Sequence, residues 1–230
     1  MVPVLLYLLV KKYVFKNWPA IRRRMTQVVV PKNFLLMAGF LMLMLMKLAS
    51  LKAQDKQLQY NILRNGKVIG WTKLTKTTTD QKSKISLESE VKARFIFLFV
   101  VSALEEAAFE RGVLVYSSQF RKTNSDVKEN KTMKLTNHGY EMYKGKDTEQ
   151  LQIPILRNHM LSLYFDEPTQ CSRVYSDSFQ RVLDIERLGK GGYKINLPDG
   201  NSSSYYYENG ICTRVEINHR MYSAEMVLSK

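Results

Sequence analysis

The chain has 230 residues, two cysteines and a formal net charge of +14. A charge of this size suggests a nucleic-acid partner, but its distribution along the chain argues against one. Residues 1–53 hold nine Lys and Arg and neither Asp nor Glu, which leaves 26 basic and 21 acidic side chains in the remainder. These charges are interspersed, without the stripe of like charge that follows a phosphate backbone, so nucleic-acid binding is not expected.

Residues 1–53 have the pattern of a secretory leader. The uncharged run NFLLMAGFLMLMLM, residues 33–46, would reach about 21 Å as a helix, short of the ~30 Å hydrocarbon layer of a bilayer. Cations at 22–24 precede it and small residues follow it, as in a signal peptide. We predict a helical leader removed near Ala53, with Met25 as a candidate true start. A core helix or a retained anchor is the alternative.

A leader of this kind predicts that the mature protein is exported and meets the membrane only through the leader. Residues 54–230 then suit one β-rich domain. In LQYNILRNGKVIGWTKL, the pair Asn65-Gly66 fits a two-residue hairpin turn. That turn would place Ile62 opposite Ile69 and Tyr60 opposite Trp71 on one side of the ribbon.

The next segments continue with apolar and polar residues in alternation. Residues 84–94 predict a strand whose outer face is wet, and from Phe95 onward both faces are apolar. Residues 105–120 read as one strand, although residues 102–111 alone would also suit a helical turn. Residues 121–131 read as a polar loop or hairpin tip, and residues 132–145 as two short strands around an Asn-His-Gly turn.

Residues 153–165 (IPILRNHMLSLYF) lack alternation and predict one short helix. The last third returns to strands over 181–188, 193–198, 202–208, 211–218 and 221–228, separated by Gly- and Asn-rich turns. Short strands joined by hairpin turns predict a mainly β fold: an antiparallel meander whose sheet is strongly curved and carries one short helix.

Three segments resemble one family: YNILRNGKVIGW, LYFDEP with VYSD, and LPDGNSSSYYYENGICTRVEIN. They are similar to the exported Bacteroidota family named domain of unknown function 6134, and the likeness spans nearly all of residues 57–228. The resemblance implies a β-rich protein in the periplasm or at the outer-membrane periphery of a Gram-negative bacterium, distantly similar to half-barrel sheets such as the lipoprotein carriers of the envelope. It implies no activity and no catalytic residues.

The residue types that carry chemistry are sparse. Cys171 and Cys212 permit one disulfide in an oxidising compartment, and two separate buried thiols are the alternative. No metal-ligand spacing occurs, so no metal or cofactor is expected, and surface or capping roles are expected for the three histidines. These histidines are His138, His159 and His219.

Asp184 and Glu186 lie two residues apart on a predicted strand and would share a face. Such a pair could serve acid/base chemistry or hold calcium, but a solvated face with Arg181 and Arg187 as partners is the favoured interpretation. No GxSxG motif is present, so we predict no catalytic residue and no enzymatic activity.

The aromatic residues suggest a binding surface, since a curved sheet under one short helix leaves a concave side to fill. We predict a non-enzymatic protein that binds an apolar or lipid-like ligand there. The alternative is a structural or protein–protein interaction module of the envelope that uses its sheet edge and an exposed side chain among Tyr205–Tyr207. The residues predicted to line the groove are Tyr60, Trp71, Phe95, Phe97, Phe99 and Phe109.

Overall fold

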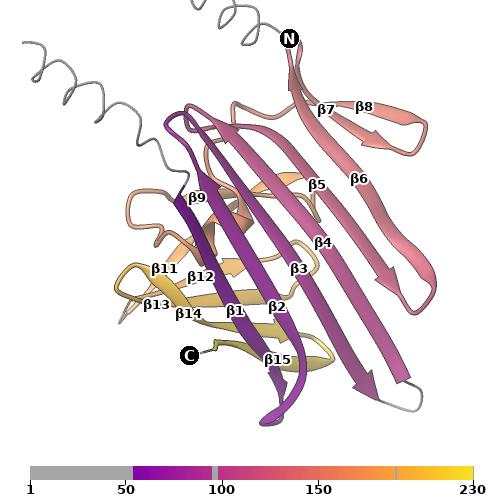
Figure 1. Ribbon diagram of the computed structural model, residues 1–230, viewed down its shortest axis with the longest axis vertical. Coiled ribbons are helices and arrows are strands. Elements are labelled where there is room, and N and C mark those ends of the chain that lie inside the picture. The colour runs from indigo at the N-terminus through magenta and orange to yellow at the C-terminus, as the bar shows by residue number, and fades with distance from the viewer. Residues whose placement is uncertain (1–53, 95–97, 190, 230) are drawn as a thin grey trace, which may run out of the picture. The chain divides into compact units, whose positions relative to one another are not determined.

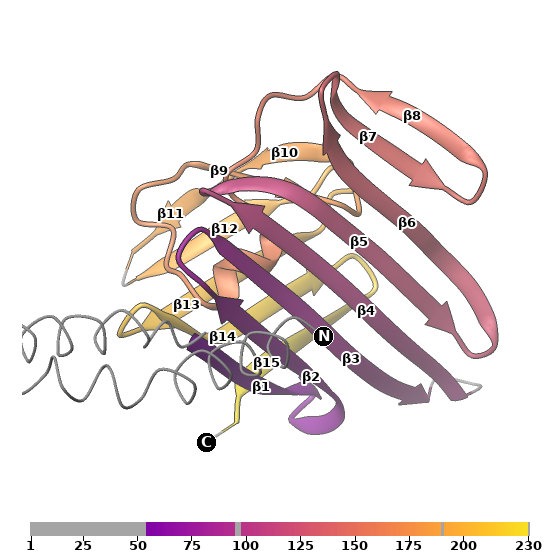
Figure 2. The same ribbon diagram turned by 45° about the horizontal axis from the view of Figure 1, so that its top comes forward.

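The computed structural model describes residues 54–94, 98–189 and 191–229, so the leader predicted over 1–53 lies outside the described residues. Thirteen strands form one antiparallel sheet in the order β11-β12-β13-β14-β15-β1-β2-β3-β4-β5-β6-β7-β8. Two meanders are joined where β1 pairs with β15, and the sheet stays open between its edge strands β8 and β11. Figures 1 and 2 show the two meanders curving toward each other. The predicted mainly β, antiparallel and curved fold is confirmed.

The strands of both meanders follow the chain order. The N-terminal meander contains β1 (Gln54–Arg64), β2 (Lys67–Thr78), β3 (Lys82–Arg94), β4 (Leu98–Glu110), β5 (Val113–Thr123), β6 (Asp126–Thr136), β7 (Gly139–Lys144) and β8 (Asp147–Leu151). The C-terminal meander contains β11 (Glu186–Leu188), β12 (Gly192–Asn196), β13 (Ser202–Glu208), β14 (Ile211–His219) and β15 (Tyr222–Leu228).

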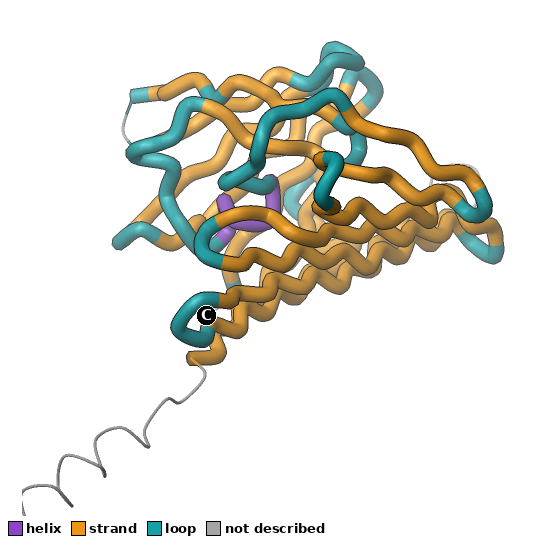
Figure 3. The backbone as a smooth tube through the Cα atoms, turned by 90° about the horizontal axis from the view of Figure 1, so that it is seen from above, coloured by secondary structure: helices purple, strands orange, loops and turns teal. Residues whose placement is uncertain are grey.

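The segment that links the two meanders lies on the concave side of the sheet. It contains the 3₁₀ helix η1 (Met160–Tyr164) and a separate hairpin of β9 (Arg173–Ser176) and β10 (Arg181–Asp184). Figure 3 shows this helix enclosed by the curved strands. The short helix predicted within 153–165 is therefore present as a single 3₁₀ segment. Across the three described ranges, no helix combines the length and the apolar character needed to span a membrane.

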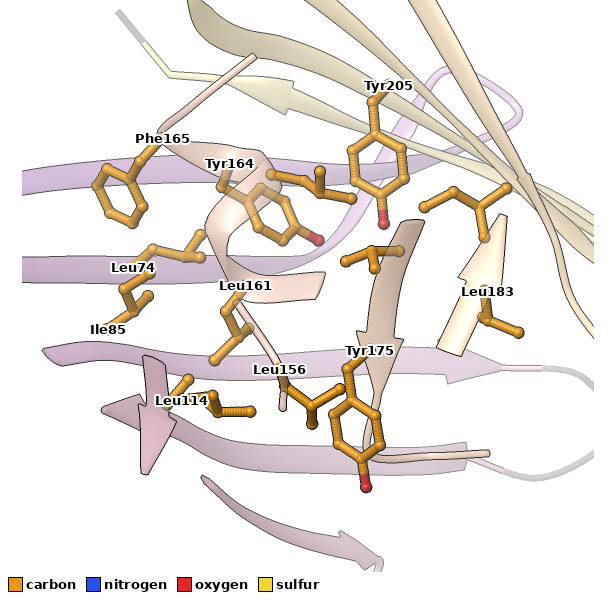
Figure 4. Packing of buried hydrophobic residues seen from close by; sticks show 14 of the residues in the cluster. Leu74, Ile85, Leu114, Leu156, Leu161, Tyr164, Phe165, Tyr175, Leu183 and Tyr205 are labelled. Atoms are coloured by element: carbon orange, nitrogen blue, oxygen red, sulfur yellow. The ribbon is translucent and has the colours of Figure 1, made fainter. Parts of the chain in front are cut away.

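The core lies between the linking segment and the inner face of the sheet. In Figure 4, Leu161 and Tyr164 of η1 lie beside Leu74 of β2 and Ile85 of β3. Each fully buried aliphatic side chain stabilises the fold by about 1.5–3 kcal/mol. The buried hydroxyl of Tyr60 donates a hydrogen bond to the carbonyl of Cys212 at 2.7 Å, so its polar atom is satisfied inside the core.

The β1–β2 hairpin corrects one prediction. A bulge shifts the register after Ile62, so that Ile62 pairs with Gly70, and Tyr60 with Thr72. Trp71 therefore lies on the outer face, opposite to Tyr60, because one extra residue reverses every side chain beyond it. The bulge brings the β2 backbone close to β3: a Cβ at Gly70 would lie 2.3 Å from the carbonyl oxygen of Glu90.

Residues 105–120 form two strands rather than the predicted single strand. Arg111 and Gly112 turn the chain between β4 and β5, with φ values of +50° and +73°. Arginine rarely adopts positive φ, so this pair lacks the usual sequence signal of a hairpin turn. Residues 121–131, predicted as a polar loop or a hairpin tip, form the tip of the β5–β6 hairpin, with its turn at Asn124. Residues 181–188, predicted as one strand, are divided between β10 and β11.

Candidate ligand-binding cavity

A cavity of about 510 Å³ lies between the inner face of the sheet and the linking segment. This volume falls within the range of ~300–1,000 Å³ that is usual for small-molecule sites. One side is closed by η1 of the linking segment, through Met160, Leu161 and Tyr164. The sheet walls are largely apolar and include Ile62, Ile69, Leu87, Val91, Val101, Ala103, Ile217 and Met226.

The cavity extends along β4. Side chains at alternate positions of a strand share a face, so residues 99, 101, 103 and 105 follow one another along the inner wall. At ~3.3 Å per residue, Phe99 and Glu105 lie roughly 20 Å apart. Phe99 is 38% exposed and Tyr222 is 41% exposed, whereas Ala107, just beyond Glu105, is fully buried.

We call the exposed end of the cavity, with Arg64, Phe99 and Tyr222, the rim. The guanidinium of Arg64 lies over the ring of Tyr222, 5.7 Å from its centroid. We call the buried end the floor. The polar residues of the floor that border the cavity are Glu105, Gln119, His159, Asp177 and Ser178.

The centre of the floor is a buried pair, His159 and Asp177, which are 1% and 6% exposed. Nε2 of His159 lies 2.8 Å from Oδ2 of Asp177, and Oδ1 of the same carboxylate accepts a hydrogen bond from the hydroxyl of Ser117 at 2.7 Å. Nδ1 of His159 accepts a hydrogen bond at 3.1 Å from the backbone N–H of Leu161, so the histidine caps η1. This bond places the proton of the neutral imidazole on Nε2, from which it is donated to Asp177.

The electrostatics of this pair lower the pKa of Asp177. Burial acts to raise the pKa, but the neighbouring His159, the hydrogen bonds from His159 and Ser117, and the charge of Lys131 lower it and prevail. Because the folded-state pKa is below that of the unfolded chain, the carboxylate stabilises the fold above the unfolded pKa of ~3.9. That stabilisation is lost as the pH falls through the folded-state pKa.

We therefore expect an acid-dependent difference between the wild-type protein and Asp177→Asn. The wild type should have the higher free energy of unfolding at pH 7. The gap should narrow as the pH falls below about 4 toward the lower folded-state pKa, because the unfolded chain takes up a proton that the folded carboxylate resists. Urea unfolding at a series of pH values measures this gap. A difference in unfolding free energy that stays constant down to the lowest pH at which both proteins fold would contradict a lowered pKa for Asp177.

Beside this pair, Gln119 and Glu105 lie directly opposite each other on β5 and β4. Nε2 of Gln119 donates to Oε1 of Glu105 at 2.8 Å and to the hydroxyl of Ser178 at 2.9 Å. A carboxylate only accepts hydrogen bonds, so Glu105 fixes the orientation of the Gln119 amide. Within the described part of the chain, the buried Oε1 of Gln119 has no hydrogen-bond partner, an omission that costs about 1–3 kcal/mol.

The predicted aromatic groove is only partly assembled. Phe99 borders the cavity, while Tyr60 and Phe109 face inward but are buried in the core. Phe109 also borders a second, more polar hollow beside residues 166–171. Trp71 was wrongly placed because the bulge turns it outward, and Phe95 and Phe97 lie outside the described residues.

The cysteines and two of the histidines lie away from the cavity. Cys171 and Cys212 are free thiols, so the bridge does not form, and burial raises the pKa of Cys212 to about 12. The exposed His138 lies in the β6–β7 turn, where its carbonyl accepts a hydrogen bond from the side chain of Gln150. His219 stacks on Tyr222 with ring centroids 4.6 Å apart.

The acidic pair predicted on one strand is divided between two. Asp184 ends β10 and pairs with Arg173 at 3.3 Å, and its side chain is 84% exposed. Glu186 begins β11, is exposed, and accepts a hydrogen bond from the side chain of Asn196. Both carboxylates are exposed to solvent, which agrees with the favoured interpretation. Their partners are Arg173 and Asn196, however, and not the predicted arginines.

The expectation of an exposed tyrosine among Tyr205–Tyr207 is also wrong. Tyr205 is buried beside the cavity, and the hydroxyl of Tyr207 donates to the carbonyl of Leu163 at 2.7 Å. A bulge after Tyr206 shifts the register between β13 and β14 at this point. Tyr206 is half-buried because the guanidinium of Arg214 lies over its ring, 4.3 Å from the centroid.

The floor contains serine, histidine and aspartate, but not in the order of a hydrolytic triad. In such a triad the serine bonds to the histidine, and the aspartate orients the histidine. Here the hydroxyl of Ser117 donates to Asp177, and both ring nitrogens of His159 are engaged elsewhere. No cluster of three or more His, Cys, Asp or Glu that could hold a metal ion occurs among the residues described by the structure.

The open, curved sheet with an internal cavity defines a β-barrel-like protein. The chain belongs to the family described as "Domain of unknown function (DUF6134)", which matches residues 60–229. The fold is similar to that in "Crystal Structure of Beta-barrel-like Protein of Domain of Unknown Function DUF1849 from Brucella abortus", with a TM-score of 0.53 and 11% identity. The match covers 79% of this chain and 98% of that chain and concerns the fold alone. No curated protein matches the sequence.

Proposed function

We propose that the protein is a non-enzymatic carrier that holds an apolar or lipid-like ligand in the cavity between its curved sheet and η1. The observation that carries the proposal is the cavity itself, with largely apolar walls and a volume of about 510 Å³. Its rim has two partly exposed aromatic side chains, Phe99 and Tyr222, where a ligand would enter. Affinity would come from burial of apolar surface, at ~25 cal/mol per Å², without a chemical step.

The composition of residues 1–53 supports export, so we place this carrier in the periplasm or at the outer-membrane periphery of a Gram-negative bacterium. A periplasmic carrier would shield an apolar molecule from water between two membranes. The structural or interaction module is the weaker proposal. Of the two features it relied on, the open sheet edge is present, but Tyr205–Tyr207 are buried or half-buried.

Titration with Nile red, a neutral dye whose fluorescence rises in apolar surroundings, tests the carrier function. We expect saturable binding of one dye per chain, and competition by a single-chain amphiphile such as dodecan-1-ol. Non-saturable, weak fluorescence from a correctly folded protein would contradict the proposal. Such a result together with capture of one envelope protein would favour the interaction module.

A further inference from the structure

The two ends of the cavity differ in the hydrogen-bonding groups they offer. The rim carries a cation, Arg64, whereas the floor contains the carboxylates of Glu105 and Asp177 and the amide oxygen of Gln119. We infer that the ligand is an amphiphile whose head group is a hydrogen-bond donor, a hydroxyl or an ammonium, and that Glu105 and Gln119 bind this head group at the floor. This inference rests on the proposed function and specifies the chemistry of the ligand.

The acceptor capacity of Glu105 supports this inference. Its Oε1 accepts from Gln119, and it has no ion-pair partner among the described residues. The next residue, Glu106, faces the opposite side of the sheet and pairs with Lys84 at 2.6 Å. A half-buried carboxylate that borders the cavity and forms no ion pair with a described residue is left to accept a donor from a ligand.

Gln119 adds a second acceptor. Its Oε1 is buried without a partner in the described part of the chain, while its Nε2 is held by Glu105 and Ser178. A small rotation of the side chain would turn the oxygen toward a donor on the ligand while keeping the bond to Glu105. Binding would then relieve an unsatisfied buried group, which a ligand without a donor cannot do.

An anionic head group fits the floor poorly. The donors of His159 and Gln119 are already used within the protein: the Nε2 proton of His159 is given to Asp177, and the amide protons of Gln119 are given to Glu105 and Ser178. An anion would therefore meet the carboxylates of Glu105 and Asp177 with few free donors. A carboxylic acid of the same chain length would be held more weakly, or with its head at the rim near Arg64.

Competition against Nile red with three probes of equal chain length tests the inference at pH 7: dodecan-1-amine, dodecan-1-ol and dodecanoic acid. In the wild-type protein the amine and the alcohol should bind more tightly than the acid. Glu105→Gln, which keeps the size of the side chain and removes its charge, should weaken amine binding about tenfold or more. It should leave binding of the acid unchanged or slightly tighter, and Glu106→Gln, on the outer face, should alter none of the three.

The outcomes separate this inference from the proposed function. If Nile red binds but the three probes compete equally, and Glu105→Gln changes none of them, the donor head group is wrong while the carrier remains. If Glu105→Gln weakens all three probes and the dye alike, Glu105 shapes the cavity and does not select the head group, which also overturns the inference. If wild-type protein does not bind Nile red, the carrier function itself fails.

Discussion

Replacing Asp177 with alanine is expected to lower the free energy of unfolding by about 3–5 kcal/mol. Asp177 is buried and accepts hydrogen bonds from both His159 and Ser117. Its removal leaves two buried donors without a partner, one of which belongs to the residue that caps η1. Because η1 closes one side of the cavity, the change should also loosen the linking segment. Urea or thermal unfolding measures the loss.

Asp184→Ala is the matched control for this substitution. Asp184 is also a paired aspartate at a strand end in the linking segment, but its side chain is 84% exposed and its partner is Arg173. Exposed ion pairs contribute about 0–1 kcal/mol, so this variant should unfold almost like the wild type. Equal losses for the two variants would show that the buried network at the floor does not stabilise the fold.

Filling the cavity is expected to abolish ligand binding. Ala103 lies on the inner wall of β4, midway between the rim and the floor. In Ala103→Phe, a ring would occupy the space between the sheet and η1 that we assign to the ligand. Nile red binding should fall at least tenfold, and the protein should keep its fold, because the cavity can accept the added atoms without the ~1–3 kcal/mol of strain that overpacking causes in a full core.

Ala108→Phe provides the matched control, since Ala108 lies on the same strand but faces the outer side of the sheet. This variant should bind the dye like the wild-type protein. Circular dichroism and thermal unfolding check that both variants fold. Normal dye affinity in a folded Ala103→Phe protein would place the binding site elsewhere and remove the support for the cavity.

The strands were predictable where residues typical of hairpin turns separate them in the sequence. Asn65-Gly66 and Asn209-Gly210 combine residues that tolerate positive φ, and both pairs form turns between adjacent strands. Arg111-Gly112 was missed because arginine is an unusual residue at positive φ, although tertiary pairing of β4 with β5 holds it there. Alternation of polar and apolar residues was enough to predict a curved antiparallel sheet, but not where each hairpin turns.

The site was less predictable than the fold. Gly70 within the predicted strand was the sequence signal for a bulge in β2, which moved Trp71 to the outer face and set the register of the wall. The floor joins Glu105 and Gln119 of the sheet to His159 and Asp177 of the linking segment. These residues are widely spaced in the chain and form no motif, so only the path of the linking segment across the concave face brings them together.

The central claim is that the cavity carries a ligand, and mass spectrometry tests it most directly. Protein purified without detergent should be extracted with organic solvent, and the extract should be compared with that from Ala103→Phe. We predict a single class of amphiphile in near-stoichiometric amount from the wild type, and its loss from the variant. Equal amounts in both extracts, or an empty wild-type protein that also fails to take up added amphiphile, would contradict the account.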